Sequence, residues 1–311
     1  MNIEDIRRIL VVGTGTMGQK IALQCARFGY EVTAYDAFAK SLDSAKARIP
    51  EYAAELVDRN LMAAEEATAA LSRISFTMNP EEGAQADLIS ESVLEDPELK
   101  GKVFSQFNAI CPPHTLFTTN TSTLLPSMFA SATGRPDKFA ALHFYGVWIK
   151  NLADIMPHPG TSPETLCLLV AFARRIGQVP TVLKKEYPGY IGNTILGALN
   201  AVALKLVFTD QVASVEDVDR AFMLLEGTPV GPFGWLDHNG LDTIWHVMES
   251  GAKTSGDPGA QEFADMFKRE YIDKGWLGVK SGKGFYSYPN PAYSQPDFLS
   301  GPADNQGNGA I

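Results

Sequence analysis

Three glycines near the start of the chain have a spacing that could bind phosphate groups. The apolar run LVVG ends at Gly13, and Gly15 and Gly18 follow where a helical pattern begins. In such a turn the first glycine permits the tight bend, the second lets the backbone approach a pyrophosphate, and the third lets the helix pack closely on the strand. The N-terminus of the helix adds unpaired N–H groups and a positive dipole end. This pattern predicts a dinucleotide site, although a glycine-rich turn can also serve packing alone.

Asp36 supports the dinucleotide interpretation. It follows Gly18 by 18 residues, at the end of the next predicted strand, where a carboxylate can accept hydrogen bonds from both ribose hydroxyls of an adenosine. Its charge repels a 2′-phosphate, and no arginine occurs in AFAK after it, so we expect NAD rather than NADP. The alternative is a surface aspartate beside a structural turn. The residues that this motif assigns to the cofactor are Gly13, Gly15, Thr16, Met17, Gly18 and Asp36.

His143 is the side chain best suited to transfer a proton near neutral pH. An imidazole titrates at about pH 6.5, and His143 ends the apolar run FAALHF, on the edge where parallel sheets bind ligands. The remaining histidines lie in proline-containing loops or on helical patterns: His114, His158, His238 and His246. On these observations alone, a buried structural histidine and a general acid or base are equal alternatives for His143.

Short apolar runs alternate with helical patterns from residue 9 to about 184, which is typical of β-α-β units and a mostly parallel sheet. The predicted strands are Ile9–Val12, Val32–Tyr35, Ile74–Thr77, Leu88–Glu91, Leu116–Thr119, Phe139–Phe144, Ala153–Met156 and Val179–Leu183. Met17, Ile21 and Cys25 recur at the spacing of one helix face, which would pack on the sheet. We therefore expect an α/β fold with a Rossmann-like, doubly wound sheet.

The pattern changes near residue 187. Long helical patterns with few strand signals fill residues 190 to about 274, and the residues from 289 onward are rich in Pro, Ser, Gly and Asn. We predict an NAD-binding domain over 1–186, an all-α domain over 187–288 and a flexible tail over 289–311.

Composition and charge disfavour several classes of function. The chain has 36 acidic and 26 basic residues and no lysine or arginine run, which argues against nucleic acid or an anionic membrane as a partner. The longest uninterrupted apolar stretch, near Leu166–Ala173, is far shorter than the roughly 20 residues of a membrane span. The N-terminus does not resemble a secretory signal, so we expect a cytoplasmic protein. Cys25, Cys111 and Cys167 lie far apart, so we expect no disulfide framework and no metal site, and all three in the core.

Six segments, in order along the chain, resemble the (S)-3-hydroxyacyl-CoA dehydrogenase family. They are ESVLEDPELKGKVF, TTNTSTLLPS, FAALHF, PGYIGN, GPFGWLDHNGLDT and KGWLGVKSGKGFYSY. With the glycine motif, the resemblance covers roughly residues 7 to 288. It implies a Rossmann-like domain that binds NAD, a helical domain that forms a homodimer, and hydride transfer from a secondary alcohol.

The resemblance also implies catalytic roles. His143 matches the family's proton-transfer histidine, Ser122 matches the serine that hydrogen-bonds the substrate hydroxyl, and Asn193 matches the asparagine that donates to the developing carbonyl. The family has a glutamate twelve residues after the histidine, which pairs with the imidazole, whereas this chain has Asp154 eleven residues after it. We expect Asp154 to pair with His143; the alternative is an aspartate that caps a turn.

Two further positions match cofactor contacts of the family. Asn120 matches a residue that contacts the nicotinamide half of the cofactor, and Glu91 matches the acidic residue on the nicotinamide-ribose side. A helix cap and a solvated charge are the respective alternatives. The chain departs from the family at Gly146 and Thr194, where an asparagine and an arginine are usual.

The resemblance leaves the substrate class open. The leading interpretation is a short 3-hydroxyacyl-CoA such as 3-hydroxybutyryl-CoA, whose nucleotide the family commonly holds with lysines before the third strand. Residues 37–73 contain five basic and six acidic residues here, so we expect weak and salt-dependent binding of CoA esters. One alternative is a CoA-free 3-hydroxy acid or sugar acid, as in the similar gulonate dehydrogenase and lambda-crystallin branch. Another is an NAD-binding protein that has lost turnover.

Overall fold

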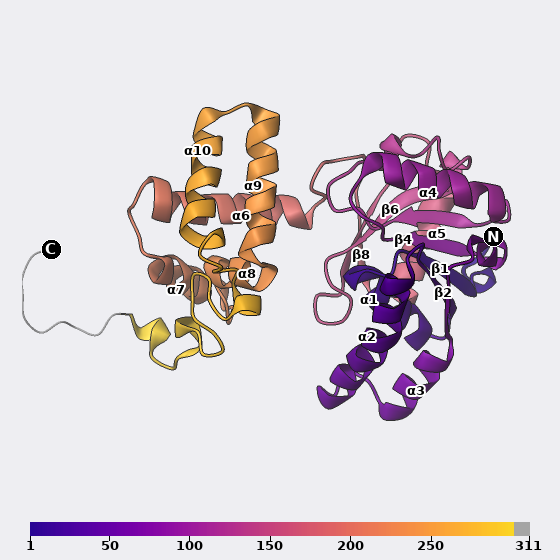
Figure 1. Ribbon diagram of the computed structural model, residues 1–311, viewed down its shortest axis with the longest axis horizontal. Helices are drawn as coiled ribbons and strands as arrows, with labels where there is room; N and C mark the ends of the chain where they lie inside the picture. Colours follow the sequence, from indigo (N-terminus) through magenta and orange to yellow (C-terminus); the bar gives the residue numbers. More distant parts are fainter. Residues whose placement is uncertain (302–311) are drawn as a thin grey trace, which may run out of the picture. The chain divides into compact units, whose positions relative to one another are not determined.

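The predicted strands form one sheet in the computed structural model, which describes residues 1–301 (Figure 1). Each strand begins and ends within one residue of its predicted range. The strands are β1 (Arg8–Val12), β2 (Glu31–Tyr35), β3 (Ile74–Thr77), β4 (Leu88–Glu91), β5 (Leu116–Thr119), β6 (Phe139–Phe144), β7 (Leu152–Met156) and β8 (Val179–Val182).

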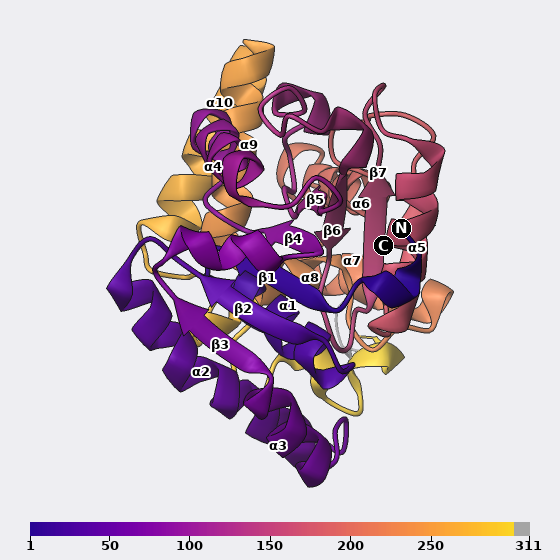
Figure 2. The ribbon, with the colours of Figure 1, turned by 90° about the vertical axis from the view of Figure 1, so that its right-hand side faces the viewer.

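The strand order across the sheet is β3-β2-β1-β4-β5-β6-β7-β8, and Figure 2 shows β3, β2, β1 and β4 side by side. The strands from β1 to β6 run parallel, β7 is antiparallel to β6, and β8 is parallel to β7. After β1 the chain adds β2 and β3 on one side, and β4 then continues the sheet on the other side. The doubly wound, mostly parallel sheet is thus confirmed, and the glycine motif lies at the switch in strand order, where such sheets bind ligands.

Alternating side chains of β1 build two separate cores on the two faces of the sheet. Ile9 and Val11 point to one face and Leu10 and Val12 to the other, as the pleat of a strand requires. The first face packs on α1 (Thr16–Arg27), α2 (Ala39–Asp58), α3 (Ala64–Ser72) and α5 (Pro163–Arg175), and the second on α4 (Pro97–Ile110). Because both faces are covered, the strands read as short, nearly continuous apolar runs.

The second unit is helical, as predicted. The chain divides after Thr194, and the second unit begins within α6 (Gly192–Leu204), which continues as a π-helix over Lys205–Thr209. The following helices are α7 (Val215–Glu226), α8 (Pro232–Asn239), α9 (Leu241–Ser255) and α10 (Pro258–Phe267). The division lies later than the predicted boundary at 186 because the segment before α6 is fastened to the first unit, where Ile191 donates a backbone hydrogen bond to Asp154.

The start of the predicted flexible tail is ordered. Short 3-10 turns form at Ala292–Ser294 and Phe298–Ser300, and the side chains of Tyr293 and Phe298 are buried in the core of the second unit. Arg220 also donates to the carbonyl of Phe298 at 2.7 Å. The tail prediction is therefore wrong for residues 289–301, because two aromatic side chains anchor this polar segment. The remainder of the predicted tail, 302–311, lies outside the described residues.

Two expectations from composition also need correction. Cys25 and Cys111 are buried as expected, but Cys167 is exposed on the outer side of α5. The helical stretch Gly192–Thr209 is long and apolar enough to span a membrane by length and composition, with a mean hydropathy of 1.3 and 11% of its residues buried. This stretch contains no long uninterrupted apolar run, because polar residues such as Asn193 and Lys205 interrupt it.

Candidate active site

The glycine motif has the geometry that a dinucleotide site needs. Gly13 has a φ of +94°, which glycine tolerates readily. A Cβ on Gly18 would lie 1.9 Å from the carbonyl oxygen of Gly13, so the packing of α1 on β1 leaves no room for a side chain. A Cβ on Gly15 would meet no atom within 4 Å. Thr16 and Met17 form the first turn of α1, so the open space at Gly15 faces the helix N-terminus that would hold a pyrophosphate.

Asp36 lies beside a cavity of about 420 Å³ that also contains the glycine turn. Its carboxylate accepts hydrogen bonds from the backbone N–H of Thr14 at 2.8 Å, from the hydroxyl of Thr14 at 3.0 Å and from the N–H of Phe38 at 3.0 Å. Phe38 and Leu94 line the cavity and are 70% and 78% exposed. A carboxylate beside exposed apolar walls suits an adenosine, so the residues present fit that end of NAD.

Glu91 is fully buried rather than open to the cofactor. Its Oε1 accepts hydrogen bonds from Nζ of Lys100 and from the N–H of Val93, both at 2.7 Å, and its Oε2 accepts from the hydroxyl of Thr119 at 2.6 Å. Burial raises the pKa of Glu91, and the charge of Lys100 and these hydrogen bonds oppose the shift. Glu91 thus anchors α4 to β4, and its expected contact with the nicotinamide ribose stays a prediction.

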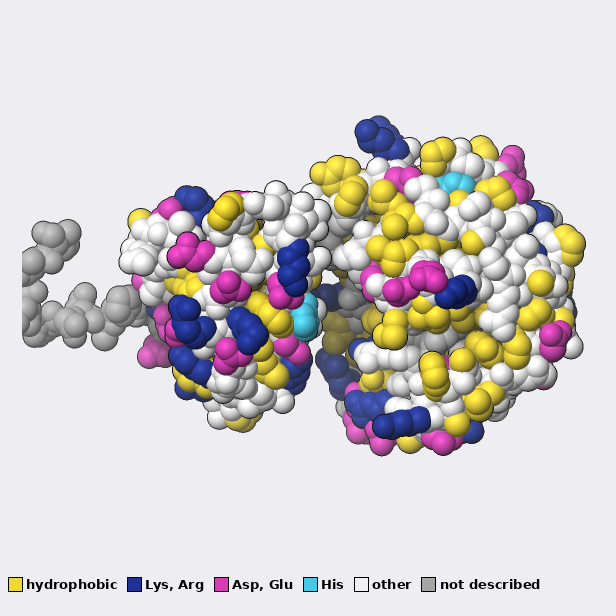
Figure 3. Space-filling view, turned by 45° about the horizontal axis from the view of Figure 1, so that its top comes forward, with side chains coloured by type: hydrophobic (Ala, Val, Ile, Leu, Met, Phe, Trp, Pro, Cys, Tyr) yellow, Lys and Arg dark blue, Asp and Glu magenta, His cyan; other side chains and the backbone are white. Residues whose placement is uncertain are grey.

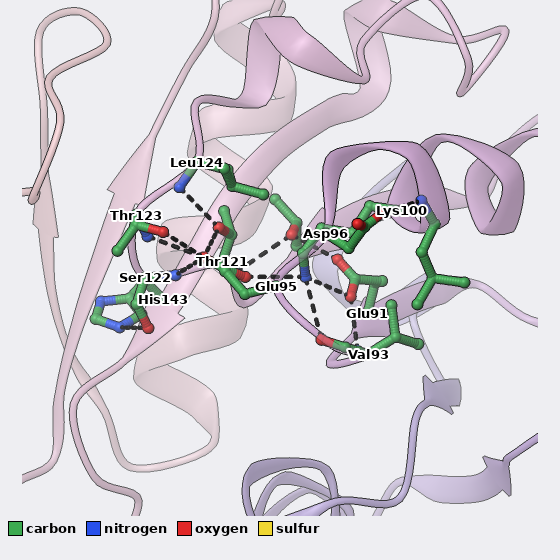
Figure 4. A network of polar contacts seen from close by, with 12 residues as sticks. Glu91, Val93, Glu95, Asp96, Lys100, Thr121, Ser122, Thr123, Leu124 and His143 are labelled. Carbon is green, nitrogen blue, oxygen red and sulfur yellow. Dashed lines mark hydrogen bonds and ion pairs between the residues drawn. The ribbon is translucent and has the colours of Figure 1, made fainter. Parts of the chain in front are cut away.

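Glu95 organises the loop that follows β5 (Figure 4). Its Oε1 accepts hydrogen bonds from the N–H of Ser122 at 2.9 Å, from the N–H and hydroxyl of Thr123 at 3.0 Å, and from the hydroxyl of Thr121. Its Oε2 lies 3.3 Å from Nζ of Lys100. Burial alone would raise the pKa of Glu95, but the hydrogen bonds and the charge of Lys100 outweigh this effect and lower the pKa. An ionised Glu95 therefore fixes the backbone that carries Ser122.

Ser122 and His143 form the central polar contact of the site. The Oγ of Ser122 lies 3.2 Å from Nε2 of His143, although the residues are 21 positions apart (Figure 4). The parallel pairing of β5 and β6 brings them together, since Ser122 follows β5 and His143 lies near the carboxyl end of β6. A hydroxyl and an imidazole at this distance can share contact with one substrate hydroxyl and exchange a proton with it.

The expected hydrogen bond between Asp154 and His143 is not formed. The two residues are direct register partners on β6 and β7. The carboxylate of Asp154 instead accepts hydrogen bonds from the hydroxyls of Tyr145 and Thr181 and from the N–H groups of Ile191 and of Gly192. The direct pairing is therefore wrong, because the shorter aspartate turns to donors that its own strand neighbours and the segment before α6 supply.

The imidazole of His143 lies in a largely apolar setting. It is 4% exposed, and within residues 1–301 its Nδ1 has no hydrogen-bond partner. Tyr145 stands edge-on to the ring at 4.6 Å and Tyr190 lies against it at 4.8 Å between ring centres. Burial lowers the pKa of His143 to about 4, and the charges of Asp154 and Glu95 oppose that shift. The imidazole is thus held neutral and ready to accept a proton at ordinary pH.

Both predicted asparagines are hydrogen-bonded to a residue within two positions of His143. The side-chain oxygen of Asn120 accepts a hydrogen bond from the N–H of Phe144 at 2.9 Å, which ties the end of β5 to β6 beside His143. Asn193 lies in the first turn of α6, and its N–H donates to the hydroxyl of Tyr145 at 3.1 Å. In the part of the chain that the structure describes, no cluster of three His, Cys, Asp or Glu side chains is arranged to hold a metal ion.

The sequence reasoning missed three functional side chains: Glu95, Lys100 and Tyr145. A usable signal existed for Lys100, because Asp96 and Pro97 mark the start of a helix and place this lysine on its inner face. A charged residue at such a position requires a buried partner. No comparable local signal existed for Tyr145, whose partners come from distant segments.

Family models match nearly the whole chain. The NAD-binding domain of 3-hydroxyacyl-CoA dehydrogenase matches residues 8–187, and the C-terminal domain of the same family matches residues 189–288. A probable 3-hydroxybutyryl-CoA dehydrogenase of Bacillus subtilis is 32% identical and covers 91% of this chain and 98% of its own length. The human mitochondrial hydroxyacyl-coenzyme A dehydrogenase is 33% identical over 91% of each chain.

Solved structures extend the comparison. A diketoreductase, described as acting on dicarbonyl compounds, is 40% identical with a TM-score of 0.83 over 91% of this chain and 99% of that one. The (S)-3-hydroxybutyryl-CoA dehydrogenase of Ralstonia eutropha is 29% identical with a TM-score of 0.79 over the same shares. The glycine motif, the sheet and both domain matches agree, so the chain belongs to the 3-hydroxyacyl-CoA dehydrogenase family and is an NAD-dependent oxidoreductase.

Proposed function

We propose that this protein reversibly oxidises a short 3-hydroxyacyl-CoA, such as 3-hydroxybutyryl-CoA, to the 3-ketoacyl-CoA, with His143 as the general base. The contact between Ser122 and His143 at the carboxyl edge of the sheet carries this proposal. It joins a neutral proton acceptor to a hydroxyl that can orient the substrate, and Glu95 fixes the loop that carries this hydroxyl.

The oxidation needs one group that accepts the proton of the substrate hydroxyl and another that accepts a hydride from the carbon bearing this hydroxyl. Nε2 of His143 takes the proton of the substrate hydroxyl while Ser122 holds that hydroxyl in place. The glycine turn and Asp36 would hold NAD, which would supply the acceptor for the hydride of the substrate carbon. Asn193 would donate to the carbonyl oxygen as it forms. In the reverse direction the protonated His143 returns the proton.

A CoA-free substrate is the second candidate, and the charges of α2 favour it. Arg48 pairs with Glu51 at 2.6 Å and with Glu55 at 2.9 Å, and Lys46 lies 3.5 Å from Asp43. Cations that are already paired offer less attraction to the phosphates of CoA. On the face drawn in Figure 3, lysine and arginine side chains lie among acidic ones rather than in one large patch. The similarity to a diketoreductase supports the same alternative.

A substrate panel that follows NADH absorbance distinguishes the two candidates. Acetoacetyl-CoA, free acetoacetate, a diketo ester and sugar acids would be compared at equal concentration and at two salt concentrations. The proposal predicts the highest kcat/KM for the CoA ester, with an affinity that falls as salt rises. A much higher kcat/KM for a CoA-free compound would replace the leading substrate and keep the hydride chemistry. Turnover of none of them would favour an NAD-binding protein without activity.

We also propose a homodimer formed through the helical domain. Exposed apolar side chains occur on α6 and α7, including Val202 at 58%, Leu224 at 59% and Leu225 at 83%. An apolar hollow of about 300 Å³ lies between these helices. A self-complementary contact would remove this surface from water. Light scattering should give the mass of a dimer at micromolar concentration, and a monomer there would contradict the proposal. A cytoplasmic location stays a prediction.

A further inference from the structure

Tyr145 connects three parts of the site: His143, Asp154 and the turn that carries Asn193. Its hydroxyl donates to Oδ2 of Asp154 on β7 at 2.6 Å and accepts the backbone N–H of Asn193 at 3.1 Å. Its ring stands edge-on to His143, with 4.6 Å between ring centres and an angle of 74°. One side chain therefore contacts the imidazole, the nearby carboxylate and the turn that carries Asn193.

The close fit of this tyrosine shows that its placement is specific. A Cβ on Gly192 would lie 2.6 Å from the Tyr145 ring, so the start of α6 approaches the ring as closely as glycine allows. Tyr190, two residues before Gly192, packs against the imidazole ring of His143 and is 1% exposed. Its φ of 55° is a left-handed value that bulky residues rarely adopt. The segment is thus bent tightly around the imidazole and Tyr145.

We propose that Tyr145 is a positioning residue for hydride transfer, which holds the carboxylate of Asp154 against the start of α6 and away from direct contact with His143. The inference rests on the proposed role of His143 as the general base. Asp154 then influences the imidazole through space, and Tyr145 sets how strongly it does so. The same hydroxyl fixes the backbone of Asn193 relative to His143.

The charge environment gives this proposal a measurable direction. The groups that face His143 are Asp154 from β7, Glu95 from the loop after β4, and the hydroxyl-bearing rings of Tyr145 and Tyr190. Tyr145 is the sole side-chain donor to Oδ2 of Asp154 among the described residues. Removal of its hydroxyl leaves the charge of Asp154 less compensated, so the pKa of His143 should rise.

The test is Tyr145→Phe, which keeps the ring and removes the hydroxyl. We expect a kcat about tenfold lower from the lost hydrogen bond, with the affinity for NAD nearly unchanged. The acidic limb of the pH profile for kcat/KM in oxidation should move to higher pH. Tyr30→Phe is the control, because Tyr30 is buried directly before β2, and its hydroxyl has no hydrogen-bond partner within residues 1–301. It should change neither quantity.

A double variant tests whether the charge of Asp154 causes the shift of the acidic limb. When Tyr145→Phe is combined with Asp154→Asn, the charge is gone, and the phenylalanine should no longer move the acidic limb. A lower kcat with an unmoved limb would reduce Tyr145 to a structural residue and overturn the proposal, as would an unchanged kcat. NMR titration of labelled His143 reads the same shift without turnover. A shift there without activity on any substrate would therefore keep the proposal and contradict the proposed function instead.

Discussion

His143 and Asp154 lie directly opposite each other on the antiparallel strands β6 and β7, but the carboxylate of Asp154 accepts its hydrogen bonds from other partners. Side chains at such opposed positions are close neighbours on one face of a sheet. Asp154 therefore supports the imidazole by its charge, while Tyr145, Thr181 and the segment before α6 hold the carboxylate in place. This arrangement differs from a direct histidine–carboxylate pair, and it determines the pH at which His143 becomes protonated.

The oxidation reaction should persist to acidic pH. Burial lowers the pKa of His143 to about 4, so the imidazole stays neutral and can accept a proton at every pH above that value. Below it the protonated ring cannot act as a base, and oxidation is lost. The kcat/KM for oxidation, measured against pH, should therefore have an acidic limb well below 6.5, the ordinary value for histidine. A limb at or above 6.5 would contradict this picture of the imidazole.

Asp154→Asn should move that limb further down. The charge of Asp154 favours the protonated imidazole and opposes the effect of burial, so its removal lowers the pKa of His143. The measurement is again the pH profile of kcat/KM, with Asp137→Asn, on the loop before β6, as the control. A profile at the wild-type position would mean that Asp154 serves the fold alone.

Lys100→Met should strongly destabilise the protein. Lys100 is 1% exposed and pairs with the fully buried Glu91, so the change leaves a buried carboxylate without its charge partner. Breaking such a pair costs about 3–5 kcal/mol of unfolding free energy. The matched control is Lys102→Met, since this lysine is 72% exposed in its pair with Glu98, and its replacement should leave the melting temperature nearly unchanged. Equal melting temperatures for the two variants would show that the buried pair contributes nothing.

Asp36→Ala should weaken the binding of NAD and reduce the preference over NADP. Loss of charge-assisted hydrogen bonds to the ribose costs about 1.5–3 kcal/mol, roughly a tenfold to hundredfold change in Kd. Asp43→Ala is a suitable control, because Asp43 is 74% exposed and pairs loosely with Lys46. Titration calorimetry with both dinucleotides measures the effect. Equal affinity of the unchanged protein for NAD and NADP would exclude the assigned discrimination.

The strands and the glycine motif could be predicted because their signals are local. Parallel strands that are buried on both faces are short apolar runs between turn residues, and Gly13 and Gly18 are fixed by their own turn. The order of β7 and β8 and the packing of Tyr293 and Phe298 depend on contacts between distant segments. Composition therefore described residues 289–301 poorly.

The site was predicted in part for the same reason. His143 and Ser122 meet because neighbouring parallel strands end at the same edge, which topology and family resemblance both indicate. Glu91 is buried while Glu95 holds the loop after β5, and these different roles depend on how Lys100 extends from α4 to both carboxylates. The partner of Asp154 depends on Tyr145 and on donors up to 38 residues away. Neither choice can be read from residue type or spacing.

The most direct test of the account is the turnover of His143→Ala measured beside its affinity for NAD. Without the general base, kcat should fall by roughly a hundredfold to ten-thousandfold, while the Kd for NAD stays within about twofold. His114→Ala, at a half-exposed histidine that contacts Asp87, should keep normal turnover. Near-normal turnover of His143→Ala, with the fold intact, would contradict the central claim that this imidazole moves the proton.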